Sequence, residues 1–374
     1  MKTEKRKTLL FLLLLTAFRP CMTVAVNAMS TGFNDRGWDT INPVIPAKLL
    51  FTSDETLNIK IYFDDLKALR RDVSDDNINH HALLAVEEED GNELIFDIKV
   101  KTRGNFRKSP ANCNFPPLRL NFDRDQLDGT VFEGQNKLKL VTHCNTNNKE
   151  FEQYVLQEYL AYRLYNILTE KSFRVRLAKI TYIDQAERQK SIVKYGFFIE
   201  DTDDMAGRNG CRKVNLQNIP LDYTDYFYQT LVAVYQYMIG NTDWSTIYTH
   251  NIRLIMEKPD LRPVPVPYDF DWCGMVNPVY AVPSYKLGIK TVEDRLFRGY
   301  ERPIDDFKRV FEYIESRKDE IYGLYMDSPL SEVQKNRSIS YLDEFFTIIA
   351  DDELIRREFV EASRKFGDNP YYGK

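Results

Sequence analysis

Apolar and polar side chains alternate in several short stretches of the first half of the chain. This alternation is typical of strands that bury one face. We therefore predict half-buried antiparallel strands at residues 57–63, 96–101, 118–122, 137–141, 178–183 and 193–200. Residues 148–168 instead place Val155, Tyr159 and Tyr162 on one stripe at helical spacing, which predicts one long helix after the fourth strand.

The pattern changes after about residue 202. Residues 222–240 have a broad apolar face and predict a helix that Gly240 ends. A loop, a strand over 252–256 and a proline-rich extended stretch over 262–271 follow. From Pro303 onward, three helical segments are predicted near residues 305–325, 330–350 and 351–366. This order of elements predicts an α+β, two-lobed protein with a ligand cleft between the lobes.

The chain begins with a basic stretch and an apolar run, "LLFLLLLTAF" at 9–18, that is too short to span a membrane easily. We predict a signal peptide over residues 1–28, which directs export to the periplasm or the extracellular space. A short N-terminal anchor and a lipoprotein attached through Cys21 are the alternatives. The rest of the chain divides into a predicted N-terminal extension (29–54), a strand-rich N-lobe with one long helix (55–201), a helical C-lobe (202–366) and a loose tail (367–374).

Charge and cysteine content refine this picture. The formal net charge of −5 gives no reason to expect a nucleic-acid partner. After residue 28, no stretch is apolar enough to cross a bilayer. An exported protein can form disulfides, and the sequence leaves three pairings open among the four later cysteines. These cysteines are Cys113, Cys144, Cys211 and Cys273.

Two carboxylates stand close together in "PYDFDWCG" (267–274). Asp269 and Asp271 lie two residues apart at the end of an apolar stretch, and in a regular strand they would face the same side. Because like charges repel, a divalent cation between them is the simplest relief, and Asn251 offers a neutral oxygen. The sequence therefore predicts a magnesium-type site. A solvated strand end with a tight turn is the alternative.

The order of these residues along the chain is more specific than either motif. A helix, Asp243 in a loop, Asn251, a strand, a turn, a second strand and Asp269 follow one another, as in the catalytic core of protein kinases. The chain resembles the atypical spore-coat protein H (CotH) kinases over roughly residues 55–280. "GNTD" (240–243) is also similar to the start of the catalytic loop in HipA-like kinases. The other similar segments are "KVKTRGNFRKSP" (99–110), "PPLRLNF" (116–122), "KLKLV" (137–141), "LQEYLAYRL" (156–164), "YGFFIED" (195–201) and "VPYDFDWCG" (266–274).

This resemblance implies a two-lobed protein-kinase-like fold that binds ATP with Mg²⁺ or Mn²⁺. Asp243 would be the base or would orient the acceptor hydroxyl. Asn251 and Asp269 would hold the metal, and Asp271 would help. His250 is interpreted as a packed histidine beside a strand.

The resemblance also implies a basic N-lobe residue at the α- and β-phosphates of the nucleotide. Lys139 and Arg119 are the candidates, because each stands alone among apolar strand neighbours, and Lys137 is the rival. Solvent-facing side chains are the alternative. Glu158 on the long helix would pair with the lysine. A compact turn would lie over the phosphates, and it consists of Arg103, Gly104 and Asn105.

Three departures from the kinase pattern bear on the function. Seven residues separate Asp243 from Asn251, where kinases have four, "DFD" replaces Asp-Phe-Gly, and no "GxGxxG" loop is present. The first hypothesis is an exported kinase that transfers the γ-phosphoryl group of ATP to a protein Ser/Thr hydroxyl. The alternative is an inactive, pseudokinase-type binding module that holds a partner at the cell envelope. A metal-dependent phosphoesterase that uses Asp269, Asp271 and His250 ranks last.

Overall fold

The computed structural model describes residues 42–73, 78–87, 91–216, 218–219 and 223–365. The predicted signal peptide, the first part of the predicted extension (29–41) and the predicted tail lie outside these residues. The chain divides into the units Met1–Thr40 and Ile41–Lys374, and all described residues belong to the second unit.

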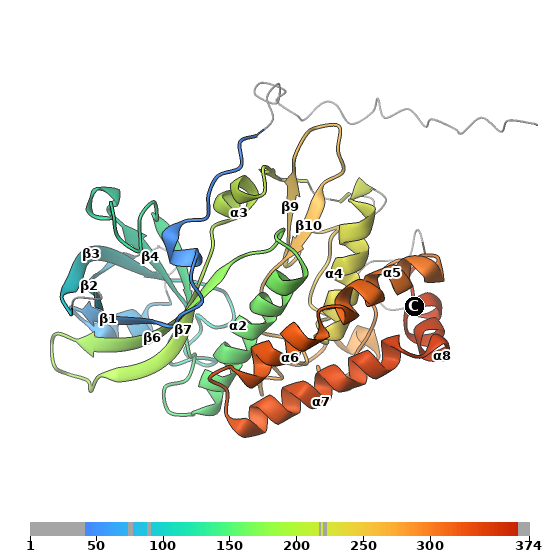
Figure 1. The fold of residues 1–374 in the computed structure, drawn as a ribbon. Helices are drawn as coiled ribbons and strands as arrows, with labels where there is room; N and C mark the ends of the chain where they lie inside the picture. The colour runs from blue at the N-terminus through green and yellow to red at the C-terminus, as the bar shows by residue number, and fades with distance from the viewer. Residues whose placement is uncertain (1–41, 74–77, 88–90, 217, 220–222, 366–374) are drawn as a thin grey trace, which may run out of the picture. The chain divides into compact units, whose positions relative to one another are not determined.

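Strands of the first half of the chain form a closed seven-stranded barrel (Figure 1). Around the barrel they follow the order β1-β2-β3-β4-β5-β7-β6. All neighbouring pairs are antiparallel except β1 and β6, which run parallel and close the barrel. The strands are β1 (Leu57–Phe63), β2 (His80–Glu87), β3 (Glu93–Thr102), β4 (Leu118–Phe122), β5 (Lys137–Val141), β6 (Val175–Asp184) and β7 (Ile192–Ile199).

The predicted two-lobed protein-kinase-like fold is therefore wrong, because the described strands close into a mixed barrel. The α+β class agrees with the structure only at a coarse level. Closure depends on pairing β1 with β6, two strands far apart in the chain, and local alternation does not say which strands pair. The prediction also missed β2, although its Ala82, Leu84 and Val86 are buried.

The interior of the barrel explains why these strands form. Their inward-facing side chains are almost all aliphatic or aromatic, and they make one continuous core. On β5, Leu138 and Leu140 belong to this core, whereas Lys137 and Lys139 lie on the outer face of the strand. The barrel thus directs its polar side chains outward, and residues that extend from its rim contribute to the site.

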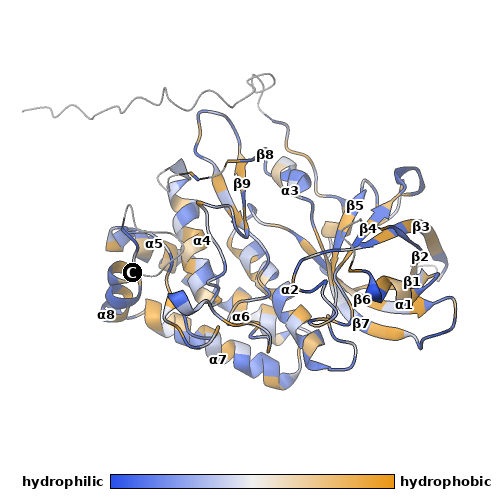
Figure 2. Cartoon of the chain, turned by 180° about the vertical axis from the view of Figure 1, so that it is seen from behind, coloured by the Kyte–Doolittle hydropathy of each residue, from blue (hydrophilic) through white to orange (hydrophobic). Residues whose placement is uncertain are grey.

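Helices and a small sheet make up the second half of the described chain (Figure 1). The sheet has the order β10-β9-β8. Apolar and polar residues alternate along α7 (Figure 2), and the apolar Leu342 and Phe345 are fully buried. Among the described residues, no helix combines the length and hydropathy needed to cross a membrane. The strands are β8 (Arg212–Val214), β9 (Ile252–Met256) and β10 (Val264–Pro267), and the helices are α3 (Thr202–Arg208), α4 (Tyr226–Met238), α5 (Ile304–Glu315), α6 (Lys318–Met326), α7 (Glu332–Ile349) and α8 (Asp352–Ile355), continued by the π-helical turn η6 (Arg356–Glu361).

Helix α2 (Glu150–Leu168) connects the barrel to the helices. It contacts β6 and β7 on the barrel side and α6 on the other, so it is buried on nearly all faces. Two polar contacts fix it: Gln157 donates to the Ser338 hydroxyl at 2.8 Å, and Tyr235 donates to the Ala161 carbonyl at 2.7 Å. A buried helix of this kind can hold a carboxyl group, Glu158, away from solvent.

Gly240 ends α4, as predicted, in the left-handed conformation with φ +67°. A Cβ atom there would overlap the Tyr341 hydroxyl, whereas one at Gly288, with φ +71°, would meet open space. We expect Gly288→Ala to lower the free energy of unfolding by about 1–2 kcal/mol through backbone strain alone. Gly240→Ala should lower the free energy of unfolding by about 1–3 kcal/mol more, because the added methyl group overpacks the site. Urea denaturation of both variants measures the difference, and equal losses would contradict it.

Candidate functional site

A pocket of about 480 Å³ lies where three chain segments meet. The first segment follows β3, the second follows α4, and the third follows β10. They bring together most of the predicted site residues, although these stand far apart in the sequence. The lining consists of Arg103, Gly104, Asn105, Phe106, Arg107, Pro117, Asp243, His250, Asn251, Asp269, Asp271 and Trp272.

The third segment is anchored by Phe270. This ring is fully buried and packs against Tyr162 and Tyr235, with centroids 4.6 and 5.5 Å away. The Asp269 N–H donates to the Tyr162 hydroxyl at 2.8 Å. Strand β10 ends at Pro267 and Asp269 has φ +64°, so Asp269 and Asp271 do not share a regular strand as predicted. Instead, a left-handed residue beside a buried ring brings the two carboxylates together, which is backbone strain of the kind found at functional sites.

Three carboxyl groups cluster beside the pocket, of which Asp269 and Asp271 line it. One oxygen each from Glu158, Asp269 and Asp271 lies within 4.8 Å of the other two. Glu158 is 1% exposed, and its Oε1 has no hydrogen-bond partner among the described residues. Burial raises the pKa of Glu158 and of Asp271 above the ordinary carboxyl range, and Asp269 adds to both shifts by repulsion. A cation among these oxygens would relieve the repulsion and favour the charged forms.

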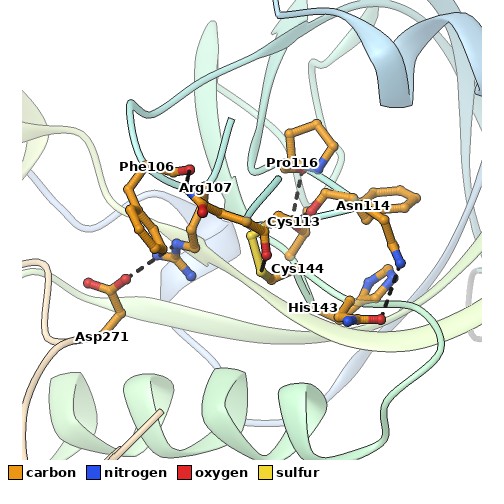
Figure 3. The surroundings of a disulfide bond; sticks show 12 residues. Phe106, Arg107, Cys113, Asn114, Pro116, His143, Cys144 and Asp271 are labelled. Atoms are coloured by element: carbon orange, nitrogen blue, oxygen red, sulfur yellow. Dashed lines mark hydrogen bonds and ion pairs between the residues drawn. A yellow bond between two sulfur atoms is a disulfide. The ribbon is translucent and has the colours of Figure 1, made fainter. Parts of the chain in front are cut away.

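Arg107 supplies positive charge to this cluster (Figure 3). Its Nε lies 3.3 Å from Asp271 Oδ2, and its Nη1 lies 3.4 Å from Glu158 Oε2. Burial alone would lower the pKa of Arg107, but the two carboxylates outweigh it and hold that pKa well above its ordinary value. The predicted partner of Glu158, the lysine at position 139, is thus replaced by an arginine.

Asp243, His250 and Asn251 form a hydrogen-bonded group at one side of the pocket. His250 Nε2 lies 2.8 Å from Asp243 Oδ1, and Asn251 Nδ2 donates to Asp243 Oδ2 at 3.1 Å. The hydrogen bond to Asp243 raises the pKa of His250. His250 is half exposed and lines the pocket, so its interpretation as a packed histidine is wrong. The side-chain oxygen Oδ1 of Asn251 is left available, since its Nδ2 is committed to Asp243.

The long spacing between Asp243 and Asn251 does not separate them. Ser245 and His250 form an antiparallel bridge, with both N–H···O distances at 2.9 Å, so the chain closes into a small loop. Thr249 and Asn251 have φ of +50° and +52° as the chain turns back. The inserted residues are partly buried against the protein, and Asn218 N–H donates to the Ile247 carbonyl. The insertion thus delivers His250 and Asn251 to Asp243.

The predicted phosphate-binding turn also lines the pocket. Arg103 is held by its own N–H, which donates to the Pro117 carbonyl at 2.9 Å, and by its Nε, which donates to the Leu118 carbonyl at 3.2 Å. Gly104 has φ +85° and borders open space, and Asn105 is exposed beside it. The turn therefore presents a guanidinium and accessible backbone to the carboxylate cluster.

Lys139 and Arg119 occupy a different position. They are cross-strand neighbours on β5 and β4, and neither is among the described residues that line the pocket. Burial lowers the pKa of Lys139 to about 8, and repulsion from Arg103 adds to the shift. Lys139 therefore lies near enough to Arg103 to be repelled by it, but outside the pocket lining. The rival, Lys137, is exposed.

Sequence reasoning missed Arg107 and misjudged His250. Arg107 follows the "RGN" turn directly in "RGNFR", so a second arginine at that spacing was the available signal. Trp272 walls the pocket, with its ring 5.6 Å from Phe106 and 6.4 Å from Tyr280. This wall of the pocket is therefore aromatic.

A second pocket of about 480 Å³ adjoins the first. The two share Asp243, His250 and Trp272, so these side chains form a partition between them. Half of the residues that line the second pocket are apolar and half are polar or charged, and Arg298 is largely buried in its wall. The remaining lining residues are Thr242, Trp244, Ser245, Val282, Pro283, Ser284, Leu287 and Val292.

A disulfide between Cys113 and Cys144 closes the segment that begins with Arg103 (Figure 3). It joins that segment to the chain after β5, and the Phe115 N–H donates to the Cys144 carbonyl beside it. The sequence left the pairing open. Cys211 and Cys273 are unpaired and buried. The cross-link limits how far the arginine-bearing segment can move from the barrel.

Comparison with known proteins adds no assignment. No family model matches the sequence, and no curated protein matches it. The functional argument therefore rests on the chemistry of the pocket residues. That chemistry combines buried carboxylates, arginines, an amide oxygen and an exposed aspartate.

Arg107→Met tests the role of charge in the cluster. Without the guanidinium, two buried carboxyl groups lose their partner, and the free energy of unfolding should fall by about 3 kcal/mol at neutral pH. Arg309→Met, which removes an exposed ion pair to Asp306, should change stability little.

The loss in Arg107→Met should depend on pH. Loss of Arg107 raises the folded pKa values of Glu158 and Asp271 further, so the deficit relative to wild type opens only as pH rises through the wild-type folded pKa, about 6 for Asp271. The deficit is therefore small at pH 4 and grows toward neutral pH. Urea denaturation at several pH values in EDTA measures this trend. A deficit that is constant with pH would contradict the assignment.

Proposed function

We propose that this protein binds a nucleoside triphosphate, ATP, together with Mg²⁺ or Mn²⁺ and transfers the γ-phosphoryl group to a protein Ser/Thr hydroxyl. One observation carries the proposal. A carboxylate cluster, an arginine-containing turn and Asp243, which lies between the two pockets, meet in one place. Phosphoryl transfer requires those parts, because catalysis depends on positioning and on neutralising phosphate charge. The proposal concerns the pocket chemistry and does not depend on a kinase-like fold.

The carboxylate cluster fits a hard divalent cation. Such ions take oxygen ligands, and Asp269, Asp271 and Glu158 offer carboxylates within 4.8 Å of one another. The unpartnered Glu158 Oε1 and the available Asn251 Oδ1 are further donors. The ion would neutralise charge between these residues and bound phosphates. When it is bound, Arg107 would be free to contact a phosphate oxygen instead of carboxylates.

The turn at residues 103–105 would contact the phosphates from the opposite side. The Arg103 guanidinium matches phosphate oxygens, and Gly104 lets a ligand approach the backbone. Lys139 is not among the described residues that line the pocket, so Arg103 replaces it in this proposal as the contact to the phosphates. Lys139 would support Arg103 only indirectly.

Asp243, between the two pockets, would act as the base in the transfer. Asp243 faces both pockets, and His250 and Asn251 fix its carboxylate. An acceptor hydroxyl in the second pocket would donate its hydrogen to Asp243 as its oxygen bonds to the γ-phosphorus. The bond from that phosphorus to the leaving diphosphate breaks in the same step. The apolar lining residues of the second pocket, such as Val282, Leu287 and Val292, favour an acceptor with an apolar group beside its hydroxyl.

A nucleotide-binding module without transfer activity is the second candidate. Both carboxylate oxygens of Asp243 already have hydrogen-bond partners, and Arg107 already neutralises part of the cluster. A site arranged in this way would bind a nucleotide and present its surface to an envelope partner. Binding and transfer must therefore be measured separately.

Nucleotide binding is tested by thermal stability. MgATP at saturating concentration should raise the melting temperature of the wild type by on the order of 3 °C, because it stabilises only the folded state. Asp269→Asn should abolish this rise, since it removes a central ligand charge. Asp260→Asn, an exposed carboxylate in the β9–β10 turn, is the matched control and should retain the rise. No rise in the wild type with any nucleotide and metal would contradict both candidates.

Transfer is tested with γ-labelled ATP and a Ser/Thr-rich acceptor protein. Asp243→Asn keeps the hydrogen-bonding shape but not the base, so labelling should fall about 10²–10⁴-fold. Its MgATP-dependent rise in melting temperature should persist. Normal labelling by Asp243→Asn would reject Asp243 as the base. Binding without labelling in the wild type would select the binding module.

A further inference from the structure

A third pocket, of about 380 Å³, lies on the barrel and belongs to neither of the two described above. It forms between α1 (Leu66–Arg71) and the loop that connects β6 to β7. Its charged lining is entirely basic within the described part of the chain. The lining consists of Lys67, Arg70, Arg71, Pro110, Asn114, Arg188 and Gln189.

Arg70 is held in place by neutral acceptors. Its Nε donates to the Asn114 carbonyl at 2.8 Å, and its Nη1 donates to Gln189 Oε1 at 2.7 Å. Its guanidinium also lies over the Phe115 ring, 5.9 Å from the centroid. These contacts fix the guanidinium without cancelling its charge. Burial lowers the pKa of Arg70, and no carboxylate contributes to that shift.

Two nearby carboxylates, Asp65 and Asp184, are committed to backbone N–H groups and to Arg188. Asp65 caps α1 by accepting from the Ala68 N–H, and its other oxygen lies 2.9 Å from Arg188. Asp184 accepts from the N–H groups of Leu66 and Arg188. Together they tie α1 to the β6–β7 loop and compensate only one of the four basic side chains.

The remaining cations are accessible. Lys67 and Arg71 are exposed and form no ion pair within the described residues. In contrast, other arginines of the described chain, such as Arg163 and Arg337, pair with carboxylates. An acidic protein that gathers uncompensated cations around one hollow has the electrostatics of an anion site.

We propose that this pocket binds a phosphate group. Guanidinium forks match phosphate oxygens, and the three uncompensated cations suit a dianion better than a single carboxylate. The pocket is too confined for nucleic acid, which requires an extended basic surface. The ligand is therefore a free phosphate ion or a phosphate monoester on a small molecule or side chain. The site is independent of the proposed nucleotide pocket, with which it shares no lining residue.

Isothermal titration of the full chain with inorganic phosphate, in EDTA at physiological ionic strength, tests this site. We expect saturable binding that weakens about tenfold in Lys67→Glu and in Arg71→Glu. Both side chains are exposed, so the variants should fold. Arg124→Glu, an exposed residue elsewhere on the barrel, makes the same charge change and should leave the affinity unchanged.

Chemical modification locates the bound ion. Phosphate should protect Arg71 from phenylglyoxal and Lys67 from acetylation, as measured by peptide mass spectrometry. A second titration with O-phosphoserine distinguishes the sources, because tighter binding than phosphate assigns a monoester and weaker binding assigns the free ion. Absence of saturable binding by the wild type at millimolar phosphate would overturn the proposal. An equal loss of affinity in Arg124→Glu, or unchanged affinity in both pocket variants, would also overturn it.

Discussion

Neutralisation of buried carboxyl groups is the constraint on which the site depends. Glu158 lies on a helix that is buried on nearly all sides, and Asp271 follows a ring locked in the core. Removing two such groups from water costs several kcal/mol each unless a cation compensates them. Arg107 provides that compensation from a segment of the barrel. One charge network therefore fixes the barrel rim, α2 and the loop after β10 relative to one another.

The sequence predicted the elements of this arrangement better than their assembly. Period-two alternation located β1, β4 and β5 at both ends, because one face of each strand is buried and the other is not. The closing pair, β1 with β6, joins residues far apart in the chain, and no local pattern encodes it. The resemblance to a kinase supplied a familiar assembly, and the closed barrel contradicts that assembly.

The site shows the same division between local chemistry and long-range geometry. Residue type and spacing pointed to the carboxylates at 269 and 271, the kinase resemblance pointed to the turn at 103–105, and these residues do meet in one pocket. Asp269 and Asp271 were predicted to meet because they share one face of a strand. This reason is wrong, because β10 has already ended and Asp269 has a left-handed backbone conformation. Lys139 was chosen for standing alone in an alternating strand, yet alternation says only that it faces outward. Arg107 was overlooked because only the fold shows that it reaches Glu158.

Two arginines near one disulfide illustrate how context decides the role of a side chain. Arg107 and Asn114, the partner of Arg70, lie on the same segment, and Figure 3 shows the cross-linked Cys113 and Cys144 between them. Arg107 meets carboxylates, so its charge is consumed within the protein unless a metal replaces it. Arg70 meets amide and carbonyl oxygens, so its charge remains available to a ligand. Identical guanidinium groups thus serve internal neutralisation in one pocket and anion recognition in the other, because only the first faces buried acids.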